Sequence, residues 1–141
     1  MQPLQVPGNL DSLSAIGKCV NEAALQAGLD KKATYRLRLA VDEIATNIVV
    51  HGYDEAGLSG QILVLSEIDA EALTIILEDN SPAFDPRQLG RPDHIDKPVE
   101  ERPIGGLGIF LTLENVDRFD YEYVNNRNRN IFVVNRPKTE G

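Results

Sequence analysis

Near residue 60, the apolar residues of this chain change their spacing from a helical period to a strand period. In the first half, Leu13, Ile16 and Val20 recur at intervals of three and four residues, the spacing of one face of a helix. Gly28 is the natural end of this helix, because glycine accepts the left-handed backbone of a C-terminal cap. The change of period predicts helices first and paired strands afterwards.

A second helix is predicted from about Lys32 to Val50, with His51-Gly52 at its end. Beyond it, the segments 61–68 and 72–79 are rich in β-branched residues and are separated by three residues. This pattern is typical of a β-hairpin. Residues 2–6 predict a short strand at the edge of the same sheet.

The second half contains one long segment without a periodic pattern, residues 80–104, which holds five of the eight prolines. A segment of this length inside one domain is usually functional, and residues 86–104 are predicted to form a lid. A glycine-rich turn then opens an apolar helix over residues 105–116. A second hairpin follows around Asn125–Arg129.

The predicted order is a strand, two helices, a hairpin, the lid, a helix and a second hairpin. Strands joined by tight turns favour a mixed, mainly antiparallel sheet, with the helices on one face of it. The predicted fold class is therefore α+β, a two-layer α/β sandwich. The length of 141 residues suits a single domain over residues 1–141.

The composition excludes several classes of protein. A net charge of −8 disfavours direct binding of nucleic acid, because the phosphate backbone is also negative. The one cysteine, Cys19, permits no intrachain disulfide and is expected to be a small core residue. His51 and His94 lie far apart, which gives a zinc site little support. The chain has no signal-peptide pattern and no membrane span, so a cytoplasmic location is expected.

Two polar residues interrupt the aliphatic pattern of the second helix. Glu43 and Asn47 stand one helical turn apart on the same face, and His51 stands a further turn along. An amide oxygen suits Mg²⁺, and a carboxylate can accept a proton from an attacking hydroxyl. The alternative interpretation is a polar helix face that meets only solvent.

Two further motifs could belong to a nucleotide site. The glycine-rich turn 105–108 precedes a helix, whose first N–H groups are free to bind phosphate. Asp79 ends a predicted strand just before the long segment, where it could accept a hydrogen bond from an exocyclic amine. The simpler interpretations are a tight turn at 105–108 and an ordinary Asp-Asn-Ser-Pro turn after the strand.

The order of these motifs resembles that of a known family. The stretch "LRLAVDEIATNIVVHGY" resembles the N box of the bacterial anti-sigma-factor serine/threonine kinases, which belong to the GHKL, or Bergerat-fold, ATPases. The stretches "LEDNSPAFDP" and "GGLGIFLTLENVDRFDYE" resemble the two glycine boxes, and "NRNIFVVNRP" resembles the closing strand. The resemblance covers nearly the whole chain.

The resemblance implies a role for each matching residue. Glu43 would be the general base, Asn47 would coordinate Mg²⁺, and Asp79 would recognise the adenine of ATP. Backbone contacts to the phosphates would come from Gly105, Gly106, Leu107 and Gly108. His51 and Gly52 would lie near the site at the end of the helix.

The resemblance also implies partners. Members of the family bind a sigma factor and phosphorylate an antagonist of the STAS type, and a homodimer is expected. One position departs from the motif, because Ser81 stands where the first glycine box has glycine. Three other functions stay open: a binding module without catalysis, a detached histidine-kinase catalytic domain, and an acidic interaction domain that binds no nucleotide.

Overall fold

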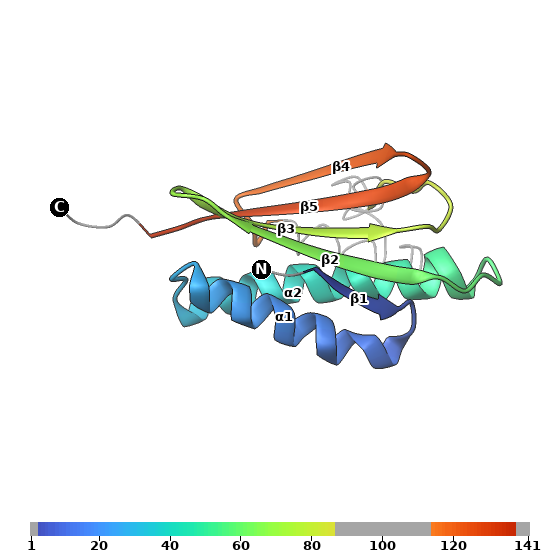
Figure 1. Cartoon of the computed structure of the whole chain (residues 1–141), viewed down its shortest axis with the longest axis horizontal. Helices are drawn as coiled ribbons and strands as arrows, with labels where there is room; N and C mark the ends of the chain where they lie inside the picture. The colour runs from blue at the N-terminus through green and yellow to red at the C-terminus, as the bar shows by residue number, and fades with distance from the viewer. Residues whose placement is uncertain (1–2, 87–113, 138–141) are drawn as a thin grey trace, which may run out of the picture.

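The chain folds into two layers, a five-stranded sheet and a pair of helices that cover one of its faces (Figure 1). The computed structural model describes residues 3–86 and 114–137. The described elements are β1 (Leu4–Pro7), a 3₁₀ turn (Leu10–Ser12), α1 (Leu13–Gln26), α2 (Lys31–Asn47), a π-helical segment (Ile48–Asp54), β2 (Gln61–Ile68), β3 (Ala72–Asp79), β4 (Arg118–Val124) and β5 (Arg127–Asn135).

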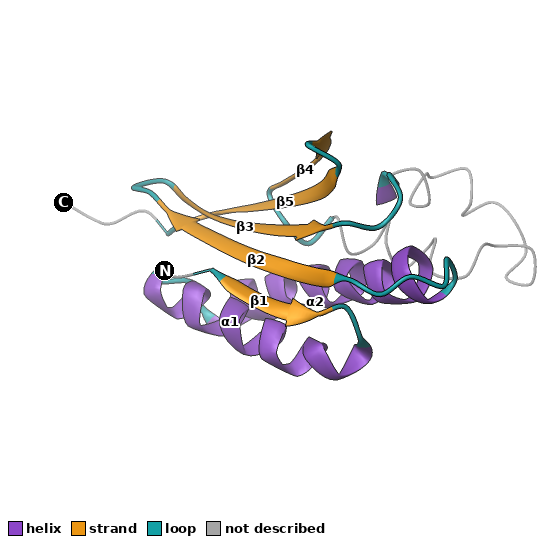
Figure 2. Cartoon of the chain, turned by 45° about the vertical axis from the view of Figure 1, so that its right-hand side comes forward, coloured by secondary structure: helices purple, strands orange, loops and turns teal. Residues whose placement is uncertain are grey.

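The strands lie in the order β1-β2-β3-β5-β4 (Figure 2). Every strand pair among the described residues is antiparallel, which agrees with the mainly antiparallel sheet that the sequence predicts. Both hairpins form where they were expected, and β1 is the predicted edge strand. Because β3 pairs with β5, Asp79 lies opposite Asn128, and these two side chains meet at one end of the sheet.

The second hairpin turns at Asn125 and Asn126, whose φ angles are 54° and 64°. Asparagine tolerates this left-handed backbone better than most residues, and two such residues form the turn that matches the twist of a hairpin. Gly28 has a φ of 79° and follows the last turn of α1. The predicted end of the first helix is therefore confirmed.

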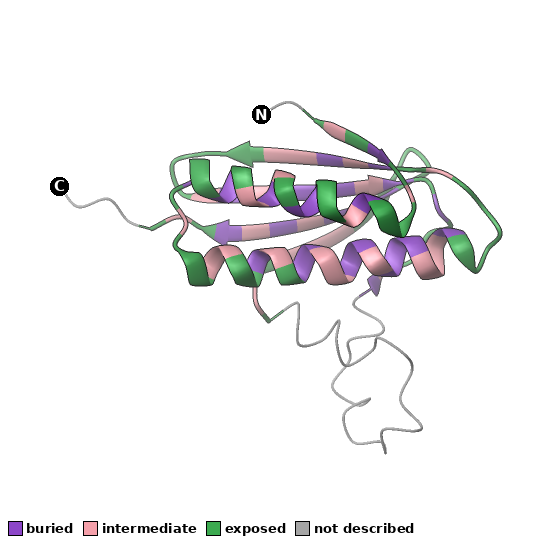
Figure 3. Ribbon diagram, turned by 90° about the horizontal axis from the view of Figure 1, so that it is seen from below, coloured by how far each residue is buried: buried purple, intermediate pink, exposed green. Residues whose placement is uncertain are grey.

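The core lies between the sheet and the two helices. Figure 3 shows buried residues on the helix surfaces that face the sheet and exposed residues on the opposite surfaces. Ile16, Val20 and Ala24 are fully buried on α1, in the positions that the helical spacing predicts. From α2, Leu37, Val41 and Ile44 pack into the same core. Helices and sheet thus share one continuous apolar layer, as expected for a single small domain.

The end of the second helix differs from the prediction. The chain does not leave the helix at His51-Gly52 but continues through the π-helical segment to Asp54. The reason is Tyr53, a residue that is 1% exposed. Its hydroxyl donates to the carbonyl of Gln61 at 2.8 Å and accepts from the N–H of Asn80 at 2.9 Å. These contacts hold the extra turn against the sheet. From Gly52 alone, the helix would be predicted to end before this turn.

Two predicted elements fall outside the described residues. Of the proposed lid, 86–104, only Pro86 is described, and of the predicted helix 105–116 only residues 114–116 are described. Within the ranges 3–86 and 114–137, the helices are too short or too polar to cross a membrane.

Candidate nucleotide site

A cavity of about 220 Å³ opens between the end of α2 and the chain that follows β3. Four of the predicted site residues lie on its wall: Asn47, His51, Gly52 and Asp79. They come from two separate parts of the chain, which the fold brings together. The remaining wall residues are Ile44, Ile48, Ser81, Pro82, Ala83, Phe84, Pro86, Asn128 and Asn130.

Asp79 is buried at the end of β3, with 2% of its surface exposed. Its Oδ1 accepts hydrogen bonds from the Ser81 N–H at 2.9 Å, from the Ser81 hydroxyl, and from the Asn128 amide at 3.1 Å. Its Oδ2 is buried and has no hydrogen-bond partner among the described residues. A buried carboxylate oxygen without a donor is costly, so this atom fits an amino group that enters the cavity.

Burial raises the pKa of Asp79, and the hydrogen bonds from Ser81 and Asn128 only partly offset this effect. A second acceptor on the cavity wall is in the same condition. The Oδ1 of Asn130 is buried without a partner within the described part of the chain. Among the described residues, the base of the cavity thus offers two buried acceptor atoms without a donor, as a site for an amino-substituted ring would.

Asn128 holds the loop after β3 in place. Its Oδ1 accepts from the hydroxyl of Tyr121 and from the N–H of Phe84 at 3.0 Å. Its amide nitrogen donates to the carbonyls of Ser81 at 2.9 Å and Pro82 at 3.2 Å. Since both ends of the amide are used, Asn128 fixes the cavity wall and Asp79 together.

Asn47 and His51 face the cavity from the helix side. Asn47 is 8% exposed, and no hydrogen bond to its side chain is found within residues 3–86 and 114–137. Its amide oxygen is therefore available to a ligand such as Mg²⁺, which needs few protein atoms because it keeps several waters. His51 is half-buried, and its Nδ1 contacts the carboxylate of Glu55 one turn further on.

Glu43 lies one turn before Asn47 on the same side of α2, at a half-buried position outside the cavity wall. Its neighbour Asp42 points elsewhere and pairs with Arg38 at 3.7 Å. The phosphate-binding candidates Gly105, Gly106, Leu107 and Gly108 lie outside the described residues. The structure thus brings together the predicted base-binding and metal-binding residues, with Glu43 beside them.

Ser81 fits its position without backbone strain. In the described ranges, φ is positive only at Gly28, Gly57, Asn125 and Asn126. The chain at residue 81 therefore does not need glycine, and the serine hydroxyl turns inward to Asp79. The departure from the motif adds a hydrogen bond to the site.

No group of three or more metal-binding side chains occurs in the described part of the chain. Cys19 is a free thiol packed against the core. Burial raises its pKa, and the nearby Glu22 raises it further, so this thiol is not activated.

Sequence reasoning missed Tyr53, Asn128 and Tyr121, all of which support the site without being typical ligands. The feature of the sequence that could have pointed to Tyr53 is a pair of glycines far from it in the chain, Gly8 and Gly60. A Cβ at Gly60 would lie 2.6 Å from the tyrosine ring, and one at Gly8 would lie 2.5 Å from it. Asn128 and Tyr121 sit in strands whose pairing register the sequence does not specify.

Comparison with known proteins agrees with this geometry. The profile of the histidine kinase-like ATPase domain matches residues 6–133. The serine-protein kinase RsbW of Bacillus cereus (strain ATCC 10987 / NRS 248) is 31% identical over 111 residues, which are 77% of this chain and 68% of the relative. RsbW of Bacillus thuringiensis subsp. konkukian (strain 97-27) matches to the same extent. The chain therefore belongs to the histidine kinase-like ATPase family, and within it to the anti-sigma-factor serine/threonine kinases.

Proposed function

We propose that the protein is an ATP-dependent serine/threonine kinase that binds a sigma factor and phosphorylates an antagonist of the STAS type. The observation that carries the proposal is the Oδ2 of Asp79 at the base of the cavity, which has no partner among the described residues. In this role Asp79 accepts a hydrogen bond from the adenine amino group. The kinase name of the relatives and their shared domain support the same activity.

The phosphates of ATP would extend from this base along the helix side of the cavity. Asn47 is the residue that would hold Mg²⁺, with its amide oxygen as a neutral, hard ligand. When bound, the metal neutralises charge on the phosphates, which is the main requirement of phosphoryl transfer. Gly105, Gly106, Leu107 and Gly108 would add backbone N–H groups to the phosphate contacts.

Glu43 would act on the acceptor. The partner's serine or threonine oxygen attacks the γ-phosphorus, the bond from that phosphorus to the bridging oxygen breaks, and ADP leaves. The hydroxyl proton passes to the Glu43 carboxylate. A position next to the cavity wall, one turn from Asn47, suits a base that meets a protein substrate from outside.

One alternative has an observation in its favour. Because Glu43 does not line the cavity, the chain could bind nucleotide and regulate a partner without transferring phosphate. Both functions require the nucleotide site, and they differ only in transfer.

The test has two stages. Calorimetric titration with ATP, ADP and GTP, with and without Mg²⁺, should show binding that prefers adenine and is strengthened by Mg²⁺. Incubation with radiolabelled ATP and STAS proteins from the same organism should then label one of them on serine or threonine. Binding without transfer to any of them would favour the non-catalytic regulator, and no binding at millimolar ATP would contradict both.

A further inference from the structure

We propose that the solvent-exposed groove between α1 and α2 binds an acidic amphipathic helix of a partner protein. The groove has a volume of about 440 Å³ and lies near the connection between the two helices. Asn47 and the nucleotide cavity lie at the other end of α2. The inference therefore does not depend on the proposed ATP site, and it can be tested without nucleotide.

The first observation is the apolar surface of the groove. Leu25 is 79% exposed and Tyr35 is 64% exposed, the two highest fractions among the large apolar residues of the described chain. Both line this groove, together with Leu29. Figure 3, which looks onto the helix layer, shows the two helices side by side there. Single exposed apolar residues are common, but two such residues in one groove indicate a surface that a partner covers.

The second observation is the placement of Arg38, on the wall of the same groove. A Cβ at Gly17 of α1 would lie 2.9 Å from both Nε and Nη2 of Arg38, so the guanidinium lies against the α1 backbone. Glycine inside a helix is unfavourable, and here it makes room for this group. Within the described residues, the contact of Arg38 with a charged group is one of 3.7 Å, from Nε to Oδ2 of Asp42. At this distance the N–H groups of the guanidinium remain available to a carboxylate of a partner.

The third observation is the charge at the start of α2. Its first turn holds Lys31 and Lys32 and no acidic residue. Positive side chains are unfavourable there, because the N-terminal end of a helix already carries partial positive charge. The adjacent end of α1 does not require them, since the carbonyl of Ala27 accepts from Arg136 at 2.9 Å. The lysines thus form a positive region on a chain of net charge −8, which favours an acidic partner over a second copy.

The fourth observation is the spacing of the wall residues, which suits a helix. Four of them form one stripe along α2: Lys31, Thr34, Tyr35 and Arg38. Lys31 and Arg38 stand two turns apart, about 10 Å along the helix axis. A helix that lies in the groove can meet both cations with acidic residues seven positions apart and fill the space between them with apolar side chains. The partner is thus a helix with two such acidic residues and apolar residues between them.

The probe for this site is a synthetic alanine-based peptide. It carries glutamate at two positions seven apart and leucine at the third and fourth positions after the first glutamate. Fluorescence anisotropy of the labelled peptide should show saturable binding to the wild-type chain. Arg38→Ala and Lys31→Ala should each weaken binding about tenfold, because each removes a charge-assisted contact. Lys32→Ala removes the same charge outside the groove wall and should have a much smaller effect.

Two further variants separate docking from effects on folding. Leu25→Ala should weaken binding about tenfold and leave the stability unchanged, because the side chain is exposed in the free protein. Leu58→Ala, at an exposed position outside the groove, is its control. The double variant Lys31→Glu, Arg38→Glu should lose the glutamate peptide and bind a peptide with lysine at the same two positions. This exchange of preference requires a folded protein.

Three results would overturn the inference. The first is the absence of saturable binding of the glutamate peptide at millimolar concentration. The second is equal affinity of the wild-type chain for the glutamate and lysine peptides. The third is a wild-type dimer in sedimentation that Leu25→Ala converts to a monomer, which would assign the groove to a second copy. Since none of these measurements contains ATP, each decides the inference whether or not the nucleotide site is confirmed.

Discussion

The Tyr53 hydroxyl accepts a hydrogen bond of 2.9 Å from the backbone N–H of Asn80, the residue directly after Asp79. The last turn of the long helix is thereby fixed to the strand end that carries the Asp79 carboxylate. The same hydroxyl donates to the carbonyl of Gln61 at 2.8 Å, which ties in the start of β2. One side chain thus links the end of the helix to the start of β2 and the end of β3.

Tyr53→Phe should lower the free energy of unfolding by about 1–2 kcal/mol, because it removes the two hydrogen bonds that the hydroxyl of the buried Tyr53 makes with the backbone at Gln61 and Asn80. It should also weaken ATP binding, since the strand end loses its tie to the helix. Chemical denaturation and calorimetry measure the two effects. Tyr35→Phe, at an exposed position on α2, is the matched control and should change neither. Equal stability of Tyr53→Phe and the wild type would contradict this role.

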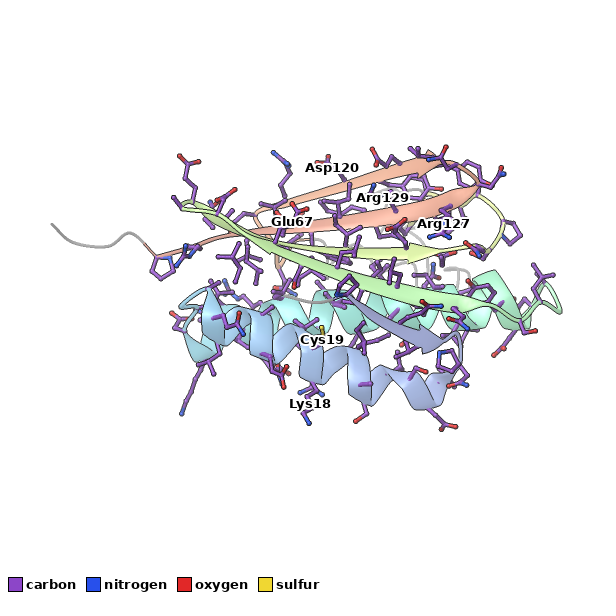
Figure 4. The ribbon with its side chains drawn as sticks, in the orientation of Figure 1. Lys18, Cys19, Glu67, Asp120, Arg127 and Arg129 are labelled. Atoms are coloured by element: carbon purple, nitrogen blue, oxygen red, sulfur yellow. The ribbon has the colours of Figure 1, made fainter. Side chains whose placement is uncertain are left out.

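Glu43→Gln should slow transfer strongly while leaving nucleotide binding intact. The amide keeps the size of the side chain but accepts no proton, so the rate of transfer should fall roughly 10²- to 10⁴-fold. A single-turnover assay with radiolabelled ATP measures this rate. Glu67, on the sheet face away from the helices, gives the control Glu67→Gln (Figure 4). Transfer at the wild-type rate by Glu43→Gln would remove Glu43 from the role of base.

Asn47→Ala should weaken ATP binding more in the presence of Mg²⁺ than in its absence. The substitution removes the amide oxygen that we assign to the metal and leaves the Asp79 end of the cavity unchanged. The measurement is the ratio of dissociation constants with Mg²⁺ and with a chelator. Asn21→Ala, on α1 and away from the cavity wall, is the control. Equal weakening under both conditions would count against the metal role.

Asp79 should give stability and binding opposite dependences on pH. Its pKa in the folded protein is raised above the ordinary value of 3.8 by burial. The folded state therefore holds more protons than the unfolded state between these two pKa values, and stability falls as pH rises through this window. Acidification from neutral pH should stabilise the protein through Asp79. It should weaken ATP binding, because the protonated carboxyl is a poorer acceptor.

Comparison with Asp79→Asn isolates this contribution. Among the described residues, Tyr53 and Tyr121 are titratable groups that interact electrostatically with Asp79, and the variant retains both. Burial raises the pKa of both tyrosines above their ordinary value of 10.0, so they stay neutral throughout the window. Urea denaturation across the acidic range should show a smaller gain on acidification for Asp79→Asn than for the wild type. Parallel curves would show that Asp79 does not titrate there.

The sequence predicted the elements of the fold well, because each has a local signal. The hairpin of β2 and β3 follows from two runs of β-branched residues, and the first helix from its apolar spacing and Gly28. The end of the second helix was missed because its cause is not local. Tyr53 finds its partners at Gln61 and Asn80, and the spacing along a helix carries no information about them.

The residues of the candidate site likewise divide into those that have a local signal in the sequence and those that do not. Asn47 and Asp79 were found because they interrupt or end an apolar pattern. Asn128 was missed, since its importance arises only when β5 pairs with β3 and places it opposite Asp79. The hydroxyl of Ser81 was identified as a departure from the motif, but its direction depends on the room at Gly52.

Strand β1 has a consequence for how the protein behaves in concentrated solution. Its four residues pair with Gln61–Val64 and so cover the first half of the edge of β2. Without them, unpaired N–H and C=O groups would be free to recruit a strand from another molecule, whereas β1 itself is short and ends in a proline. Removal of residues 1–7 is thus expected to cause aggregation. The cavity beside Asp79 should still form.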